Sequence, residues 1–277
     1  MRDLTMPCCG VLLLPALVLL PGCEVSGQND GPGQLFDDEQ YRMVDLSHPF
    51  DEDTVYWPTA PHGFELEELH YGETEAGFFY SAHRFETPEH GGTHLDAPIH
   101  FHEDGRSTEE IGLEELAGPA VVIDVRQEAD QDRDYALSPE RLAAWEDQHG
   151  EIPAGSIVLL RTGWDRYWPD EADYLGDDSD DDASALSFPS FGPEAAEILV
   201  AEREVAALGV DAASIDPGED EMFTAHQVVA EHQVPALENL TRLDELPKTG
   251  AWVVAMPMKI AGGSGGPVRA AAFVPKR

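Results

Sequence analysis

The sequence predicts one domain of mixed α/β structure, and three observations support this prediction. Apolar runs with the length of a buried strand recur at residues 119–125, 156–161 and 208–215. Segments with helix signals lie between them, at residues 138–149 and 193–207. The chain shows no repeat of fixed period and no composition shift that would mark a second domain, and a chain of 277 residues can bury a sizeable core.

Local signals place the first elements in chain order. Residues 41–48 are an expected strand that ends before Pro49. Residues 64–70 and 78–85 are two further strands, with a turn at residues 73–77 between them.

The helix at residues 138–149 has the clearest boundaries. Ser138 is a capping residue, Pro139 suits the first turn, and Gly150 stops the helix. Residues 170–184 contain a run of aspartates and are expected to be an exposed acidic loop. In the last third, the expected elements are a helix at residues 224–232 and strands at residues 234–240, 252–256 and 268–274.

The amino terminus has the features of an export signal. Residues 9–20 are free of charge and mostly apolar, and they are too short for a comfortable transmembrane helix. They lead into Leu-Pro-Gly-Cys at residues 20–23, which resembles a bacterial lipobox. We therefore expect a lipoprotein signal peptide at 1–22, lipidation of Cys23, a flexible tether at 23–40 and a domain at 41–277. The expected location is outside the cytoplasm on a lipid anchor, and a plain secretory signal is the alternative.

The cysteines restrict the chemistry. The chain has three, at positions 8, 9 and 23, so cleavage before Cys23 leaves only the lipidated one. The mature domain then has no internal disulfide, and any metal site must use His, Asp and Glu in place of thiolate.

The net charge of −39, from 55 acidic and 16 basic residues, is extreme. It argues against nucleic acid or an anionic membrane surface as a partner. A calcium-binding surface is one reading, but the chain lacks the D-x-D-x-D-G loop that would support it. A solvated surface adapted to high salt, and so a halophilic source, is the better explanation.

Residues 90–102 contain most of the candidate functional side chains. Candidates for metal binding or proton transfer in this stretch are His90, His94, Asp96 and His100. All four are even-numbered, so on an extended strand they project to one face. The glycines at 91 and 92 let the backbone approach whatever these residues bind. A polar surface strand is the alternative, and His102 joins the face only if the strand continues that far.

The stretch resembles the signature of a known family, H-x-G-T-H-x-D-x-P-x-H-F. It is matched by His90, Gly92, Thr93, His94, Asp96, Pro98, His100 and Phe101. On these residues the chain is similar to the metal-dependent cyclase family, which includes bacterial kynurenine formamidases and isatin hydrolases. The resemblance spans residues 44–274. It implies a swivelling β/β/α fold with a partly closed β-barrel-like sheet and flanking helices.

The same resemblance completes the site. His226 and Glu238 are twelve residues apart, and in the family such a pair adds metal ligands. From the residues alone, a solvent-facing helix position is the better interpretation of His226, and only the resemblance reverses it. Trp57, before Pro58, is either a core residue or a ligand-stacking wall, and the resemblance implies a wall of the substrate pocket.

The resemblance also implies the reaction. Three histidines and two carboxylates suit one or two Zn²⁺ or Mn²⁺ ions per subunit, with metal-bound water as nucleophile. His100 would move the proton, and Trp57 would stack on an aromatic substrate. The implied activity is that of an arylformamidase, which converts N-formyl-kynurenine to kynurenine and formate.

Two alternatives remain open from the sequence. One is a cyclic-amide or lactone hydrolase similar to isatin hydrolase, and the other is a non-enzymatic metal-binding lipoprotein. A homodimer or homotetramer is expected by the same resemblance.

Overall fold

The computed structural model describes residues 39–176 and 183–276. The predicted signal peptide, Cys23, most of the tether and the aspartate run at 177–182 lie outside the described residues. All described residues belong to one unit, Gly33–Arg277.

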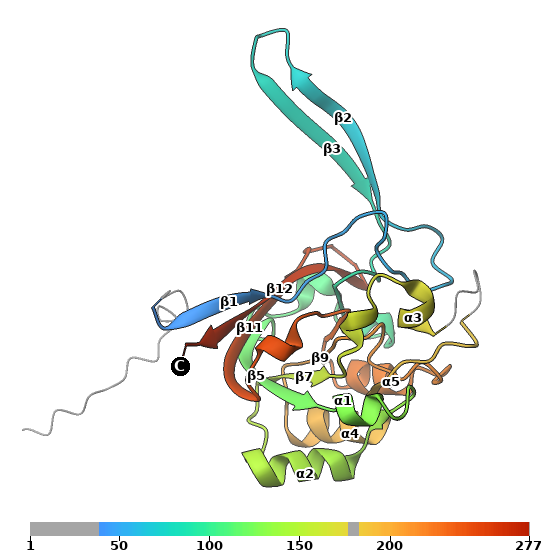
Figure 1. Ribbon diagram of the computed structural model, residues 1–277, viewed down its shortest axis with the longest axis vertical. Helices are drawn as coiled ribbons and strands as arrows, with labels where there is room; N and C mark the ends of the chain where they lie inside the picture. Colours follow the sequence, from blue (N-terminus) through green and yellow to red (C-terminus); the bar gives the residue numbers. More distant parts are fainter. Residues whose placement is uncertain (1–38, 177–182, 277) are drawn as a thin grey trace, which may run out of the picture. The chain divides into compact units, whose positions relative to one another are not determined.

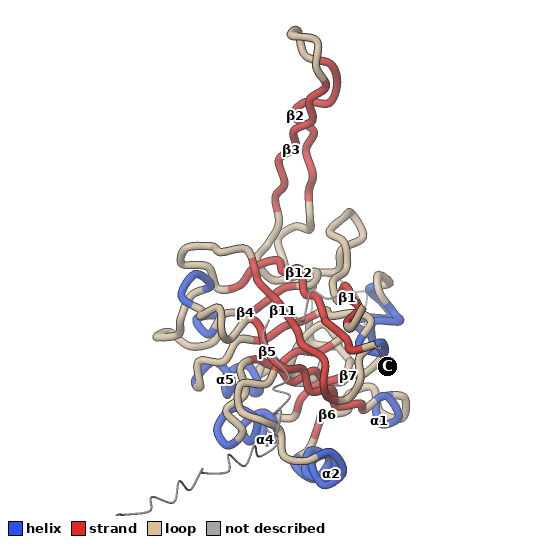
Figure 2. Tube along the Cα trace, turned by 90° about the vertical axis from the view of Figure 1, so that its left-hand side faces the viewer, coloured by secondary structure: helices blue, strands red, loops and turns tan. Residues whose placement is uncertain are grey.

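The central feature is a β-sheet that closes on itself. Its strands are hydrogen-bonded in the order β1-β12-β11-β5-β7-β9-β10-β4, and β4 also pairs with β12. The seven strands from β12 to β4 therefore form a ring, and β1 is added outside it on β12 (Figures 1 and 2). The predicted barrel-like sheet is confirmed. The strands are β1 (Tyr41–Asp45), β4 (His94–Asp96), β5 (Ala117–Asp124), β7 (Ile157–Arg161), β9 (Ala207–Val210), β10 (Ala236–Glu238), β11 (Thr249–Pro257) and β12 (Gly265–Pro275).

One half of the ring is parallel. The pairs β5–β7, β7–β9 and β9–β10 are parallel, whereas the pairs made by β1, β4, β11 and β12 are antiparallel. Parallel neighbours require long connections, and these contain the helices. The helices are α1 (Arg126–Ala129), α2 (Pro139–His149), α3 (Glu171–Leu175), α4 (Pro193–Glu197) and α5 (Thr224–Glu231).

Shorter elements complete the fold. The small pair β6 (Ala136–Leu137) and β8 (Ser190–Phe191) is parallel. The strands β2 (Glu65–Glu73) and β3 (Phe79–Glu86) form an antiparallel hairpin that extends away from the ring (Figures 1 and 2). Single 3₁₀ turns occur at Pro98–His100, Thr108–Glu110, Trp164–Tyr167 and Leu243–Glu245. Among the described residues no helix is long and apolar enough to cross a lipid bilayer.

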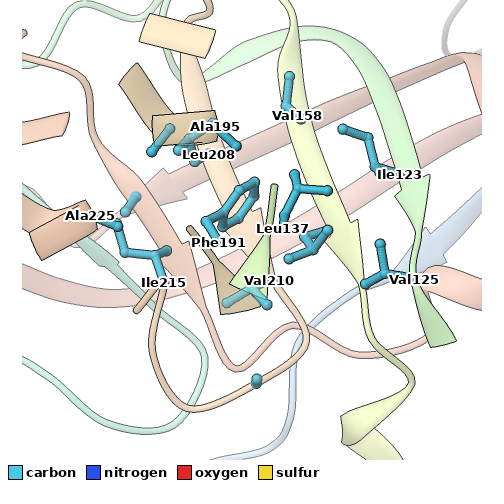
Figure 3. Close-up of a cluster of buried hydrophobic side chains, with 14 of the residues drawn as sticks. Ile123, Val125, Leu137, Val158, Phe191, Ala195, Leu208, Val210, Ile215 and Ala225 are labelled. Atoms are coloured by element: carbon cyan, nitrogen blue, oxygen red, sulfur yellow. The ribbon is translucent and has the colours of Figure 1, made fainter. Parts of the chain in front are cut away.

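Two apolar cores explain the uninterrupted apolar runs of the parallel strands. Along β7, Val158 packs outward against the helices (Figure 3), and so does Leu160, whereas Ile157 and Leu159 point into the ring. The strand is buried on both faces, so it lacks the alternation expected of a half-exposed strand.

Three predicted boundaries are wrong. The helix expected at 193–207 leaves α-geometry after α4 and ends in a π-helical turn, Ile198–Glu202, because the chain must reach β9 at Ala207. The strand expected at 208–215 ends at Val210, where the sheet pairing stops. The acidic loop expected at 170–184 contains α3, because the buried side chains of Tyr174 and Leu175 anchor it.

Candidate functional site

Two residues of the metal motif lie on β4, the short strand that closes the ring. His94 and Asp96 project to the same side of this strand, while Leu95 between them enters the core. The neighbouring strand β10 places Glu238 directly opposite His94 in the antiparallel register. Directly paired residues lie on the same face of a sheet, so Glu238 faces the same space as the motif residues.

The expected long ligand strand is wrong. β4 ends at Asp96, and Pro98 starts a 3₁₀ turn that includes His100. This turn folds the chain back, so the ring of His100 stacks on that of His90 with 3.7 Å between centroids. Proline has no N–H for continued strand pairing, which explains the break. His102, expected to join the face only on a continuous strand, is not among the residues that line the pocket.

Gly91 and Gly92 allow the loop that carries His90 to pack closely against the rings of Tyr56 and Phe50. Gly91 has φ +150°, and a Cβ there would lie 2.1 Å from the Tyr56 ring. Gly92 has φ +55°, and a Cβ there would lie 2.7 Å from Phe50. Any other residue would force the loop, and His90 with it, away from the site.

The five predicted ligands converge around the Asp96 carboxylate. Its Oδ1 is 2.5 Å from His90 Nδ1 and 3.1 Å from His94 Nε2. Its Oδ2 is 3.0 Å from His226 Nε2, which projects from α5. The carboxylate of Glu238 lies 3.5 Å from His94 Nε2 and 3.1 Å from His226 Nε2. Two overlapping groups could hold a metal ion, one of His94, Asp96 and Glu238 and one of His90, Asp96 and His100.

The donor atoms fit a divalent cation. The Nδ1–H group of His94 donates to the Gly92 carbonyl oxygen at 2.9 Å, which leaves the Nε2 lone pair directed at the site. That Nε2 is buried and has no hydrogen-bond partner. Asp96 and Glu238 are both buried, and two desolvated carboxylates need compensating positive charge. A bound cation satisfies both requirements.

The pKa values of the site residues reflect both their burial and the charges of their neighbours. Burial by itself lowers the pKa of His94, but the Asp96 and Glu238 carboxylates outweigh it and raise the pKa to about 9. Burial likewise opposes ionisation of Asp96, yet the surrounding imidazoles hold the pKa of this carboxyl well below its usual value. In His100 burial dominates and lowers the pKa to about 4, so this imidazole is neutral at pH 7.

Sequence reasoning missed the groups that orient the histidines. The Nδ1–H group of His226 donates to Asp216 Oδ2 at 2.5 Å, and Asp216 also accepts from the backbone N–H of Ala225 and of His226 at the start of α5. Behind His90, its Nε2 lies 2.8 Å from Ser264 Oγ, which in turn donates to the Glu89 carboxylate at 2.7 Å. No motif marks these residues: Ser264 is distant in sequence from His90, and Asp216 and Glu89 reach their partners only through the folding of the loops that carry them.

A pocket of about 310 Å³ opens onto the site. Trp57 lines it, as predicted from the resemblance, and its ring also packs on Phe223 and Phe188 with 5.5 and 6.3 Å between centroids. Phe101 and Phe223 complete the aromatic wall and were not predicted. Phe223 has φ +53°, an unusual backbone conformation for a bulky residue that often occurs at functional sites. No lysine or arginine lines the pocket in the part of the chain that the structure describes.

Comparison with known proteins places the chain in a family. The family model Cyclase, described as "Putative cyclase", matches residues 44–217. Isatin hydrolase of Roseibium aggregatum is 38% identical over 197 residues, which cover 68% of this chain and 73% of that protein. Kynurenine formamidase of Bacillus anthracis is 26% identical over 233 residues, which cover 83% and 96%. The crystal structure of an isatin hydrolase bound to the product analogue thioisatinate superposes with a TM-score of 0.80 at 31% identity, covering 88% of this chain and 96% of that one.

Asp216→Asn tests the orienting role of this carboxylate. Amide for carboxylate weakens the acceptor that fixes the His226 ring, so the affinity of the metal-free protein for Zn²⁺ or Mn²⁺ should fall by about 10–100-fold. Isothermal titration measures this directly, without reference to activity.

Asp170→Asn is the matched control, because Asp170 also accepts a backbone N–H group at the start of a helix, α3, but does not line the pocket. Its metal affinity should equal that of the wild type. Equal affinities in all three proteins would contradict an orienting role for Asp216.

Proposed function

This chain belongs to the Cyclase family, and from that premise we propose that its buried site hydrolyses an amide bond in the manner of an arylformamidase. It is a metal-dependent hydrolase, like its relatives. The observation that carries the proposal is the convergence of three histidines and two buried carboxylates beside an aromatic pocket.

Five residues would hold one or two Zn²⁺ or Mn²⁺ ions. They are His90, His94, Asp96, His226 and Glu238. Nitrogen and oxygen donors without thiolate suit both metals. A divalent cation supplies Lewis-acid polarisation of a carbonyl and makes a water molecule more acidic. Asp216 and Ser264 hold two of the imidazoles in place for this task.

His100 moves the proton in this proposal. It lines the pocket, and one of its ring nitrogens lies within 4.8 Å of the donor atoms of His90 and Asp96. A neutral imidazole accepts a proton from the attacking water and then gives it to the leaving nitrogen of the amide. The same position is compatible with a direct contact to a metal, so the test must separate the two roles.

Trp57, Phe101 and Phe223 are proposed to hold an aromatic substrate by stacking. N-formyl-kynurenine, the substrate implied by the formamidase relatives, is the first candidate. Its amino-acid tail carries a carboxylate, however, and the described pocket has no lysine or arginine to pair with it.

A cyclic amide is therefore the second candidate. The absence of lysine and arginine from the described pocket lining favours a neutral, flat substrate, and the similarity to isatin hydrolase agrees with it. A metal-capture lipoprotein, by contrast, would need neither the aromatic wall nor His100.

Location and assembly are also proposals. The proposed export on a lipid at Cys23 is supported by the apolar run and the lipobox. Intact-mass measurement of membrane-extracted protein tests it, and an unmodified Cys23 in an uncleaved chain would rule it out.

The acid excess supports a halophilic source, in which salt screens the self-repulsion between acidic side chains. A homodimer or homotetramer is the proposed assembly.

His100→Asn should lower kcat by about 10²–10⁴ while leaving the metal content unchanged, because a proton carrier is lost and the five ligands remain. Steady-state kinetics and elemental analysis on the same sample measure both quantities. The control is His102→Asn, a neighbouring histidine outside the pocket, which should keep wild-type kcat. Loss of metal in His100→Asn would identify His100 as a ligand instead, and full activity would exclude both roles.

Neutral substrates should be preferred over charged ones. We expect kcat/KM for isatin and for neutral formanilide to exceed that for N-formyl-kynurenine by about 10-fold or more, because an unsatisfied buried polar group costs about 1–3 kcal/mol and a charged one costs more. Parallel assays on one preparation measure the ratio. Preference for N-formyl-kynurenine would contradict the pocket argument while leaving amide hydrolysis intact.

A further inference from the structure

Residues 246–277 contain no acidic residue, although the chain as a whole is strongly acidic. Across the whole sequence about one residue in five is Asp or Glu, and the last of them is Glu245. The segment after Glu245 instead holds five basic residues, including all three lysines of the chain. Its composition therefore differs sharply from that of a molecule with a net charge of −39.

This segment forms the neighbouring strands β11 and β12, and β1 pairs with the other edge of β12 (Figure 1, blue and red). The three strands contain a single acidic residue, Asp45. Its carboxylate forms an ion pair with Arg269 at 2.7 Å, so it adds no unpaired negative charge. The acid-free part of the sequence is thus one continuous surface of the sheet.

The outside of these three strands exposes apolar side chains. The helices α2, α4 and α5 cover the outside of β5, β7 and β9. On β1 and β11, and just after β11, Met43, Trp252, Met256 and Met258 are instead between 39% and 69% exposed. Met43 and Trp252 are both register partners of Phe273, so they form one row across the three strands. We call these four exposed residues the outer face.

We propose that the outer face docks on a lipid bilayer, with its four side chains at the boundary between headgroups and acyl chains. The proposal rests on the lipid anchor proposed at Cys23 and is independent of the substrate. Docking in this way leaves the active-site pocket open, because none of its lining residues belongs to β1, β11 or β12.

The position of the anchor supports a bilayer as the partner. Cys23 precedes Tyr41, the first residue of β1, by 18 residues. A chain of that length spans at most about 60 Å. A lipid at Cys23 therefore keeps β1 near the bilayer and raises the effective concentration of the outer face there. A contact that would be weak for a free protein is then sufficient.

The side chains of the outer face suit the boundary of a bilayer. Tryptophan is enriched at membrane–water interfaces, and methionine adapts its shape to an irregular apolar surface. Lys259 directly follows Met258, and Arg269 is the register partner of Met256, so basic groups adjoin the apolar patch. Long basic side chains bury their stems against apolar surface while their charges reach the headgroups.

Charge selects this face over the others. The net charge argues against an anionic membrane surface as a partner for the molecule as a whole, because its carboxylates are repelled. All of its 55 acidic residues except Asp45 lie outside the three strands. The outer face therefore brings apolar and basic groups to the headgroups with little of this repulsion.

Quenching of tryptophan fluorescence by brominated lipids tests the proposal on the full, lipid-anchored chain. The protein is reconstituted in vesicles of phosphatidylcholine and phosphatidylglycerol, with and without bromine on the acyl chains, and intact mass verifies the lipid at Cys23. The emission of Trp252 is the difference between the wild type and Trp252→Phe, a change that keeps an aromatic ring beside Phe273. We expect bromine to remove most of this emission, because it quenches tryptophans that contact acyl chains.

Met222 provides the matched controls, because it is 70% exposed and precedes α5, away from the three strands. In the Trp252→Phe background, the emission of Met222→Trp should be unchanged by bromine. Met256→Glu places a carboxylate in the outer face and should restore much of the Trp252 emission in brominated vesicles. Met222→Glu should restore none.

Three results would overturn the proposal. An unmodified Cys23 would remove the anchor and the docking with it. In a lipidated chain, Trp252 emission that acrylamide quenches and bromine does not would show that the outer face stays in water. Emission that neither agent quenches would show that a second copy or another segment of this chain covers the face. Amide hydrolysis on the same vesicles reports on the proposed function separately, because the outer face does not line the pocket.

Discussion

The site depends on two carboxylates buried among imidazoles. Asp96 and Glu238 have lost most of their contact with water, and unpaired burial of either charge would cost several kcal/mol. Three histidines and a divalent cation would offset this cost together. Asp216 orients the His226 ring, and Ser264, which donates to Glu89, orients the His90 ring. The same arrangement that is costly to fold suits the site to a cation beside an aromatic pocket.

The closed sheet allows this arrangement. β4 is only three residues long, yet it pairs with both β10 and β12 and so completes the ring. Glu238 arrives beside His94 through the β10 pairing, and Ser264 reaches His90 from just before β12. The pocket wall and the hairpin are also one continuous segment, because residues 55–61 and 88–91 line the pocket on either side of β2 and β3.

Much of this was predictable from the sequence where local patterns decide the outcome. The capped helix at Ser138 and the buried strand β7 follow from residue type and apolar period, and the structure has both. The ligand cluster was recognisable because its members lie close together in sequence and match a specific family pattern. Prediction failed where tertiary contacts override local signals: Pro98 breaks the ligand strand, the entry to β9 shortens the helix that follows Pro193, and Asp216 meets His226 only through the fold.

One measurement tests the central claim most directly: metal content and hydrolysis determined on the same purified sample, before and after chelation and reconstitution with Zn²⁺ or Mn²⁺. The account predicts one or two ions per chain, turnover of an aromatic amide, loss of both on chelation and return of both on reconstitution. Turnover that persists in metal-free protein, or a protein that binds no metal after reconstitution, would contradict it.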